Sequence, residues 1–450
     1  MKHNIKTGLL LLVVLIFGSS ELSAQQKYSL VQLVEAARNN NRLLTMKEYE
    51  VREKISKLKE DGIKRYPAPK LEGNYQYNFN LPDITVPAGS LGTVNTGSGG
   101  DQLLPAQASR FAVGQKGTYN VGVDLYQPIS QQFRIKTGLD VDRLEIKIVE
   151  KEKEKILIQL QLSIEQLYYG VLILQKQQEA GGAKLELAKT RLYDAQGAVA
   201  AGKEIAVSLS GLRASIAEQE QDLLKLSIQE QDYLGELSRI TNLDVLLLHF
   251  QQSEQDDDTL SKDIDAYKVI ALGNPDIEMA KLNIEKASLG VKAAKQSNIP
   301  DFGLIGGYYL QQGNPILPTN SPYLGISLRW NIQDIFSNRQ VQNQRFFQLK
   351  QAEENMAYTK QQVNSDLEKG WRKIKQTDAM IGTAEKLVGF RRAALKEQMD
   401  RQSAGLDIKT AMLETRSQLA EAEAGLYAAK LSSVIARSEL RSLTGQLKNR

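Results

Sequence analysis

The sequence predicts a mainly α-helical protein with a membrane β-barrel portion, built as a duplicated half-molecule. Three observations lead to this fold class. One stretch recurs about 200 residues later, four short segments alternate apolar and polar residues, and the segments between them keep an apolar seam at helical spacing. The composition agrees, because a mean hydropathy of −0.36 with only 6% aromatic residues is typical of long helices.

The duplication is clearest in two glycine-led segments, residues 202–220 and residues 405–423, which align without a gap. Gly202 of the first segment matches Gly405 of the second. A repeat of this length is no solenoid unit, because solenoid periods are roughly 20–50 residues. Each half of the chain is therefore expected to form one structural unit.

The N-terminus is predicted to be a secretory signal peptide over residues 1–24. Lys2 and Lys6 supply positive charge, an apolar run follows, and Leu22-Ser23-Ala24 resembles a cleavage site. The apolar run of about nine residues is shorter than the roughly 20 that span a bilayer. We expect an exported chain, and because it contains no cysteine its stability must come from packing and assembly.

Four segments are predicted to be transmembrane strands, because their residues alternate with a period of two. They form predicted hairpins at residues 69–129 and 300–332. Each strand has about ten residues, the length of a tilted strand that crosses a bilayer. Two hairpins on the surface of a soluble protein are the alternative. Residues 81–117, rich in Gly, Pro, Ser and Thr, are predicted to be a long exposed loop.

Four strands cannot close a membrane barrel on their own. An open sheet edge is not tolerated in lipid, where no water can bind its backbone groups. The smallest membrane barrels have about eight strands. If these strands cross a membrane, several copies of the chain must share one barrel, so oligomerisation is a physical requirement of the membrane interpretation.

The segments between the strands are predicted to be very long helices. Residues 131–201 contain no proline, and at 1.5 Å per residue they would reach roughly 105 Å. Apolar residues step by three and four from Leu157 to Leu174, which is a heptad seam. A second apolar stripe runs beside it, so we expect helical neighbours on both sides.

These patterns predict the order of segments along the chain. Each repeat has an opening helix, a β-hairpin and a long helical hairpin, whose turn we call its tip. The predicted segments are a signal peptide at 1–24, a first repeat at 25–242 with an opening helix over 28–64 and a tip near 202, a linker at 243–265 with a short strand at 246–250, and a second repeat at 266–450 with a tip near 405.

The chain resembles the TolC-like outer membrane efflux protein family over essentially its whole mature length. Residues 28–41 are similar to the family's opening helix, and residues 274–277 to its counterpart in the second half. Residues 300–302 resemble the helix-to-strand junction, and residues 443–445 the usual close of a half. These motifs are individually degenerate, so the resemblance rests on their order and their duplication.

The resemblance implies a homotrimer that shares a 12-stranded barrel in the outer membrane and continues it as an α-helical tunnel in the periplasm. It also implies a periplasmic adaptor (membrane fusion) protein and an inner-membrane pump of the RND, ABC or MFS type as partners. In that scheme the tips stay shut until the pump is engaged. The protein would be the exit duct of a tripartite efflux or secretion system.

By the same resemblance, Gly202, Gly405 and Leu406 mark the tips where the adaptor docks. The glycines are expected to end helices in any case, as glycine commonly does. The family often has carboxylates six and nine residues after the second tip glycine, and this chain has Ala411 and Glu414 there. Only Glu414 is therefore expected to contribute a carboxylate to the narrow periplasmic entrance.

Glu204 and Asp407 occupy equivalent positions beside the two tips. In a trimer they would place six acidic side chains near one mouth and attract cations. Acidic residues are also favoured in the first turn of a helix, and we expect this simpler role to dominate. Ser208 stands where the family often has Asp, so the sequence does not define the contacts that would hold the first tip closed.

No catalytic constellation is present in the sequence. The mature chain has one histidine, His249, and it lacks a Walker loop, an HExxH motif and a nucleophile elbow. We expect no metal site, because the mature chain offers one histidine and no cysteine as ligands, and we expect no cofactor. The net charge of +4 comes from interspersed charges of both signs, so nucleic acid is not an expected partner. The resemblance to the TolC-like family implies outer membrane lipid as a partner.

The leading hypothesis is a passive outer membrane channel without enzymatic activity. The alternative is an exported coiled-coil structural protein or adhesin that has no pore. A periplasmic adaptor is disfavoured, because adaptors have a single helical hairpin and no paired transmembrane strands.

Overall fold

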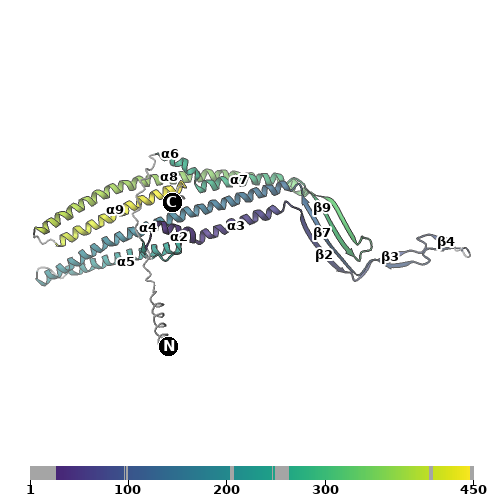
Figure 1. Ribbon diagram of the computed structural model, residues 1–450, viewed down its shortest axis with the longest axis horizontal. Coiled ribbons are helices and arrows are strands. Elements are labelled where there is room, and N and C mark those ends of the chain that lie inside the picture. The colour runs from purple at the N-terminus through teal and green to yellow at the C-terminus, as the bar shows by residue number, and fades with distance from the viewer. Residues whose placement is uncertain are drawn as a thin grey trace, which may run out of the picture. The chain divides into compact units, whose positions relative to one another are not determined.

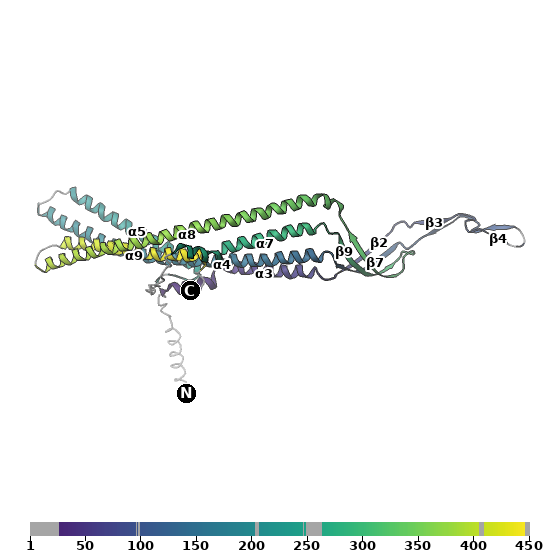
Figure 2. The ribbon, with the colours of Figure 1, turned by 90° about the horizontal axis from the view of Figure 1, so that it is seen from above.

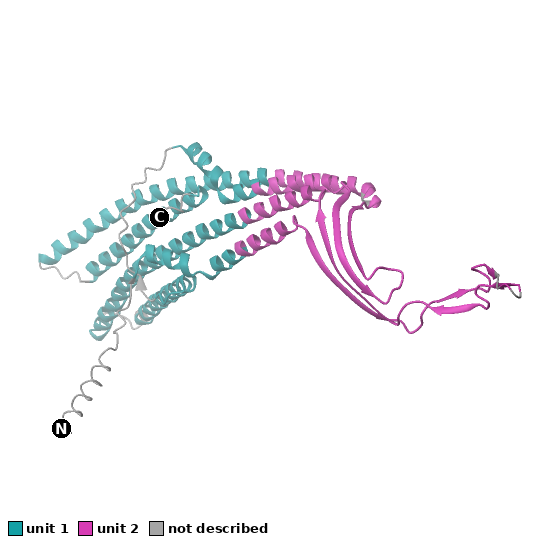
Figure 3. Cartoon of the chain, turned by 45° about the vertical axis from the view of Figure 1, so that its right-hand side comes forward, with its two compact units in different colours: residues 1–50, 148–281, 355–450 teal, residues 51–147, 282–354 magenta. Residues whose placement is uncertain are grey.

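The computed structural model describes residues 27–95, 97, 100–202, 207–245, 247–248, 263–404 and 409–445. The predicted signal peptide and His249 lie outside these residues. The chain divides into two compact units (Figure 3). Unit 1 comprises residues 1–50, 148–281 and 355–450, and unit 2 comprises residues 51–147 and 282–354.

Unit 2 contains a four-stranded antiparallel sheet with the strand order β10-β9-β7-β2 (Figure 1). Its strands are β2 (Ala68–Tyr77), β7 (Gly117–Pro128), β9 (Asp301–Gln312) and β10 (Asn320–Arg329). Strands β2 and β7 form one hairpin, β9 and β10 form the other, and β7 pairs with β9 to join them. The prediction of four strands of about ten residues in two hairpins is confirmed.

The segment between β2 and β7 is not the plain loop that the sequence predicted. It contains β3 (Asp83–Val86) paired with β6 (Ser109–Ala112), and β4 (Thr93–Asn95) paired with β5 (Asp101–Leu103). Strands of three or four residues are too short to show alternation among Gly and Pro residues. We call residues 78–116 the extension.

Long helices make up most of the remaining described chain. Helix α4 (Gln132–Ala200) has 69 residues and α8 (Ile332–Ser403) has 72, which confirms the prediction for residues 131–201. The other helices are α2 (Leu30–Asn40), α3 (Arg42–Ile63), α5 (Val207–Thr241), α6 (Ile264–Ile270), the 3₁₀ helix η1 (Ala271–Gly273), α7 (Pro275–Gln296) and α9 (Lys409–Leu443). Strands β1 (Lys27–Tyr28) and β8 (Leu247–Leu248) form a short parallel pair, so part of the strand predicted at residues 246–250 is present.

Helices α4 and α5 run side by side as one hairpin, and α8 and α9 as another (Figures 1 and 2). A Cβ on Gly170 of α4 would come within 2.6 Å of the Tyr233 ring on α5, and one on Gly181 within 2.8 Å of Leu223. These glycines therefore allow close contact between α4 and α5.

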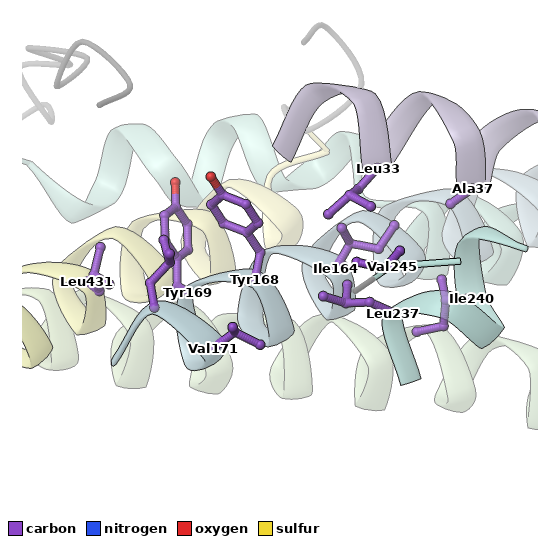
Figure 4. Close-up of a cluster of buried hydrophobic side chains, with 11 residues drawn as sticks. Leu33, Ala37, Ile164, Tyr168, Tyr169, Val171, Leu237, Ile240, Val245 and Leu431 are labelled. Carbon is purple, nitrogen blue, oxygen red and sulfur yellow. The ribbon is translucent and has the colours of Figure 1, made fainter. Parts of the chain in front are cut away.

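Apolar packing holds the opening helix on the first helical hairpin. Leu33 of α2, Ile164 of α4 and Leu237 of α5 are fully buried in one cluster, which Figure 4 shows with its neighbours. A second cluster joins α6, α7, α8 and α9 around Leu367 and Leu440. The opening helices of each half are thus buried against the long helices, and in the first cluster α9 of the second half contributes Leu431.

The predicted helix over residues 28–64 is in fact two helices, separated at Asn41. The Asn41 side-chain oxygen caps the start of α3, and its Nδ2 donates to the Ile240 carbonyl at 3.1 Å. Asn274 makes the matching bonds in the second half, where it caps α7 and donates to the Leu443 carbonyl at 3.0 Å. One asparagine per half thereby links an opening helix to the end of the second helix of the long hairpin, which is α5 in the first half and α9 in the second.

Candidate functional site

The sheet in unit 2 has one face that is apolar on every strand. In the pairing register, Val123 of β7 lies between Leu71 of β2 and Tyr308 of β9. Leu71 is 75% exposed and Leu324 is 87% exposed. Exposing such a continuous apolar surface to water would be energetically unfavourable. Exposed apolar side chains on this face are Leu71, Tyr75, Tyr119, Val121, Val123, Leu125, Phe302, Leu304, Tyr308, Leu310, Leu324, Ile326 and Leu328.

The opposite face of the sheet is polar. It carries Lys70, Glu72, Asn74, Gln76, Asn120, Asp124, Gln311, Ser321, Ser327 and Arg329. Asp124 accepts hydrogen bonds from the hydroxyl groups of Tyr309 and Tyr323. The Tyr309 ring lies against Gly122 of the neighbouring strand, where a Cβ would approach it to 2.0 Å. This alternation, with one apolar face and one polar face, is typical of the strands of a transmembrane β-barrel that separates lipid from water.

The two edge strands of the sheet, β2 and β10, are not paired with each other. Two strands lie between them, so they are roughly 14 Å apart at the usual strand spacing of about 4.8 Å. They run in opposite directions, because four consecutive neighbours are antiparallel. The β10 edge of one copy can therefore pair antiparallel with the β2 edge of another.

Charged side chains tie the helices of unit 2 together beside the sheet. Glu145 of α4 contacts Lys286 of α7 at 3.0 Å and Lys54 of α3 at 3.6 Å. The Lys286 ammonium, with lysines of α3, lowers the pKa of Glu145. This carboxylate is held ionised by cations on two neighbouring helices.

Asp142, one turn before Glu145, is in a different environment. Its side chain is buried and its Oδ1 lies 3.5 Å from Lys57 Nζ. Its Oδ2 is buried without a hydrogen-bond donor among the described residues, and the Asp61 carboxyl lies beside it. Burial raises the pKa of Asp142, even though Lys57 opposes the change. The ionised form of this carboxyl is therefore less favourable in the folded protein than in the unfolded chain.

The first tip is described up to Gly202. This residue follows the end of α4 and has a φ of +70°, a conformation in which a side chain is strained. Its backbone N–H donates to the Val199 carbonyl at 3.0 Å. Glu204, Gly405, Leu406 and Asp407 lie outside the described residues, so their roles stay predictions.

Glu414 of the second tip pairs with a residue of the first helical hairpin. It lies on α9 and forms a 2.9 Å ion pair with Arg191 of α4. Nearby, the Thr410 hydroxyl donates to Asp194 at 2.7 Å. Arg191 and Asp194 were not predicted as site residues, because no local sequence pattern shows that α9 packs against α4.

The buried carboxyl yields a pH-dependent prediction. A carboxyl with a raised pKa stabilises the fold while it is neutral, and this stability is lost as the pH rises through its folded pKa. Asp142→Asn removes the charge and can donate to Asp61, so we expect it to raise the thermal unfolding midpoint more at pH 8 than at pH 4, which is close to the ordinary Asp pKa of about 3.9. Unfolding of the detergent-solubilised protein measures this. Asp140→Asn, whose carboxylate forms a 2.6 Å ion pair with Arg143 of the same helix, is the control. A gain from Asp142→Asn that is equal at both pH values would contradict the assignment.

Comparisons with known proteins agree with this architecture. Residues 266–446 match the outer membrane efflux protein family. None of the curated proteins matches the chain by sequence. The family match thus covers the second repeat, while the first half is related to known proteins through its fold.

Several solved structures share the fold. A membrane protein from Pseudomonas aeruginosa has a TM-score of 0.70 at 16% identity, over 92% of this chain and 90% of its own. The outer membrane protein VceC from Vibrio cholerae has 0.70 at 15%, over 92% and 96%. The Campylobacter jejuni CmeC outer membrane channel has 0.70 at 15%, over 93% and 85%. Residues 266–446 thus match the outer membrane efflux protein family, and the chain as a whole shares the fold of these outer membrane channel structures.

Proposed function

We propose that the protein is a homotrimeric channel that serves as the exit duct of a tripartite efflux or secretion system. The observation that carries this proposal is the sheet of unit 2, with its apolar face, its polar face and its two unpaired antiparallel edges. Such a sheet is stable in lipid only when other copies close it into a barrel. The apolar face then contacts lipid and the polar face lines water.

Three copies give a barrel of twelve strands. Barrels of about eight strands are filled by their own side chains or hold one small ligand, whereas those of 16–18 leave a wide aqueous channel. Twelve strands lie between these limits and suit a passage for small solutes. The trimer also follows from the resemblance to TolC-like proteins, in which the long helices form a periplasmic tunnel.

The two repeats, residues 25–242 and 266–450 joined by the linker 243–265, supply two similar helical hairpins to each copy. A trimer then presents six similar tips, and adaptor hairpins dock at Gly202, Gly405 and Leu406. The inner-membrane pump supplies the energy and the selectivity. The channel contributes the size and the charge of its passage, including Glu204 and Asp407 near the mouth.

The contacts between α4 and α9 are suited to hold the entrance closed. Arg191 with Glu414 and Asp194 with Thr410 join the two helical hairpins of one copy close to the tips. The Arg191 and Glu414 side chains are nearly half exposed, so the pair is weak enough to break when an adaptor docks. We infer that Glu414 acts as a latch through Arg191 rather than as an unpaired carboxylate ring.

Channel activity is tested by recording single-channel conductance in planar bilayers, with the mass of the complex measured in detergent. We expect a trimer with a mostly closed pore. Three exposed ion pairs of about 0.5 kcal/mol each hold the entrance shut, so Glu414→Gln should raise the open probability roughly tenfold, since 1.4 kcal/mol is a factor of ten. Glu397→Gln, which removes an ion pair within α8, should not. A monomer without conductance would support the exported structural protein instead.

Docking at the tips is tested with Gly202→Val. The glycine has open space around it, so the variant should fold, but its positive φ forces a β-branched residue to distort the turn at a cost of about 1–2 kcal/mol. We expect normal amounts of trimer in the outer membrane and loss of dye efflux from cells that lack the natural copy. Gly235→Val, which also has open space but an ordinary φ, is the control. Normal efflux by Gly202→Val would argue against docking at this tip.

The assignment of the apolar sheet face to lipid is tested with Val123→Arg. An arginine on a lipid-facing strand position near the bilayer centre costs about 2–4 kcal/mol, so the variant should be depleted from the outer membrane and degraded. Asn120→Arg lies on the same strand but on the polar face, and it should insert normally. Immunoblots of outer membrane fractions measure both. Equal insertion of the two variants would refute the assignment of the faces.

A further inference from the structure

The extension, residues 78–116, is tied at its base to the sheet, and it continues beyond the ends of β2 and β7 (Figure 1). The Asn78 N–H donates to the Lys116 carbonyl at 2.7 Å. The Gln115 N–H donates to the Gly313 carbonyl at 3.0 Å, in the turn between β9 and β10. The sheet therefore sets the direction in which the extension leaves it.

The β3–β6 ribbon within the extension has an apolar face and a polar face. Ile84 lies opposite Phe111 on the apolar face, and Thr85 lies opposite Arg110 on the polar face. Ile84 is 55% exposed and Phe111 is 57% exposed. A two-stranded ribbon alone is marginally stable in water. This ribbon would be more stable with its apolar face covered.

We propose that the apolar faces of three extensions, one from each copy of the trimer, pack together around the threefold axis. They form a collar above the outer mouth of the barrel. This inference rests on the proposed trimer and adds to it a second contact between copies, centred on Ile84 and Phe111.

The dimensions allow such a collar. Twelve strands at about 4.8 Å spacing, tilted by about 40°, give a barrel with a radius of about 12 Å. Ile84 lies six residues beyond Asn78, which is a reach of roughly 20 Å at about 3.3 Å per residue. This exceeds the radius of the barrel, so the ribbons can reach the axis. They also start on β2, the edge strand that meets the next copy, so the barrel already holds them close together and raises their effective concentration.

The charges of the extension favour association with its own copies. It has two acidic residues, Asp83 and Asp101, and two basic residues, Arg110 and Lys116. Copies of the extension therefore do not repel one another. Asp83 and Arg110 both lie on the polar face, where side chains of opposite sign on neighbouring ribbons can attract. A charged lipid surface would instead be matched by a face of one sign.

Disulfide trapping tests the collar without background, because the natural chain contains no cysteine. We expect Phe111→Cys to give a disulfide-linked dimer when outer membranes are oxidised with copper phenanthroline, since one disulfide can join two of the three ribbons. Ile84→Cys, on the same face, should give the same product. The matched control is Arg110→Cys, the next residue on the opposite face, which should stay at least fivefold less linked on a non-reducing gel.

The mass of each unoxidised variant in detergent separates this inference from the proposed function. If the variants are monomers in detergent, both the channel proposal and the collar fail. If they are trimers but neither Phe111→Cys nor Ile84→Cys forms a dimer, the collar alone is wrong. Equal linkage of Arg110→Cys, or linkage of Phe111→Cys only to another protein, also overturns the collar.

Discussion

The hydrogen bonds of the sheet edges are the constraint on which the molecule depends. In lipid, an unpaired backbone N–H or C=O has no water to bind, so an open four-stranded sheet cannot exist there. The described sheet has two such edges, on β2 and β10, and an apolar face that needs lipid or protein against it. Closure by other copies satisfies both requirements, which makes assembly a condition for membrane insertion rather than a later event.

The same asparagine contact occurs once in each half of the helical part. Asn41 caps α3 and donates to the Ile240 carbonyl at the end of α5. Asn274 caps α7 and donates to the Leu443 carbonyl at the end of α9. The apolar cluster around Leu33 and Ile164 also includes Leu431 of α9, so the two halves share packed apolar contacts away from the tips. Close to the tips, the halves are linked by exposed polar pairs such as Arg191 with Glu414. Apolar packing away from the tips and weak pairing close to them suit an entrance that opens by moving one hairpin relative to another.

Much of this fold could be predicted from the sequence, because long elements repeat their signal many times. The heptad seam of α4 and the alternation of β7 each extend over many residues, so single irregularities did not hide them. The break at Asn41 was missed because the apolar pattern continues across it, and the break depends on a bond to Ile240, about 200 residues away. The ribbons of the extension were missed because three- or four-residue strands have no readable period.

The candidate site was less predictable. Glu414 was singled out from the sequence, but its partner Arg191 depends on how α9 packs against α4, and helix packing is not encoded in a local pattern. The buried state of Asp142 was likewise invisible, since scattered carboxylates on long helices are normally solvated. The raised pKa of Asp142 comes first from its burial and then from the Asp61 carboxyl beside it, against the opposing effect of Lys57.

Linking the two sheet edges tests the central claim most directly. Leu71→Cys on β2 is combined in turn with Leu324→Cys, Ile326→Cys or Leu328→Cys on β10. Within one copy these positions are roughly 14 Å apart, beyond the 4.4–6.8 Å between Cα atoms that a disulfide spans. A shared barrel predicts, in at least one register, oxidation to a ladder of bands that ends at the covalent trimer. Absence of linkage in every register, or a ladder that ends at another number of copies, would contradict it.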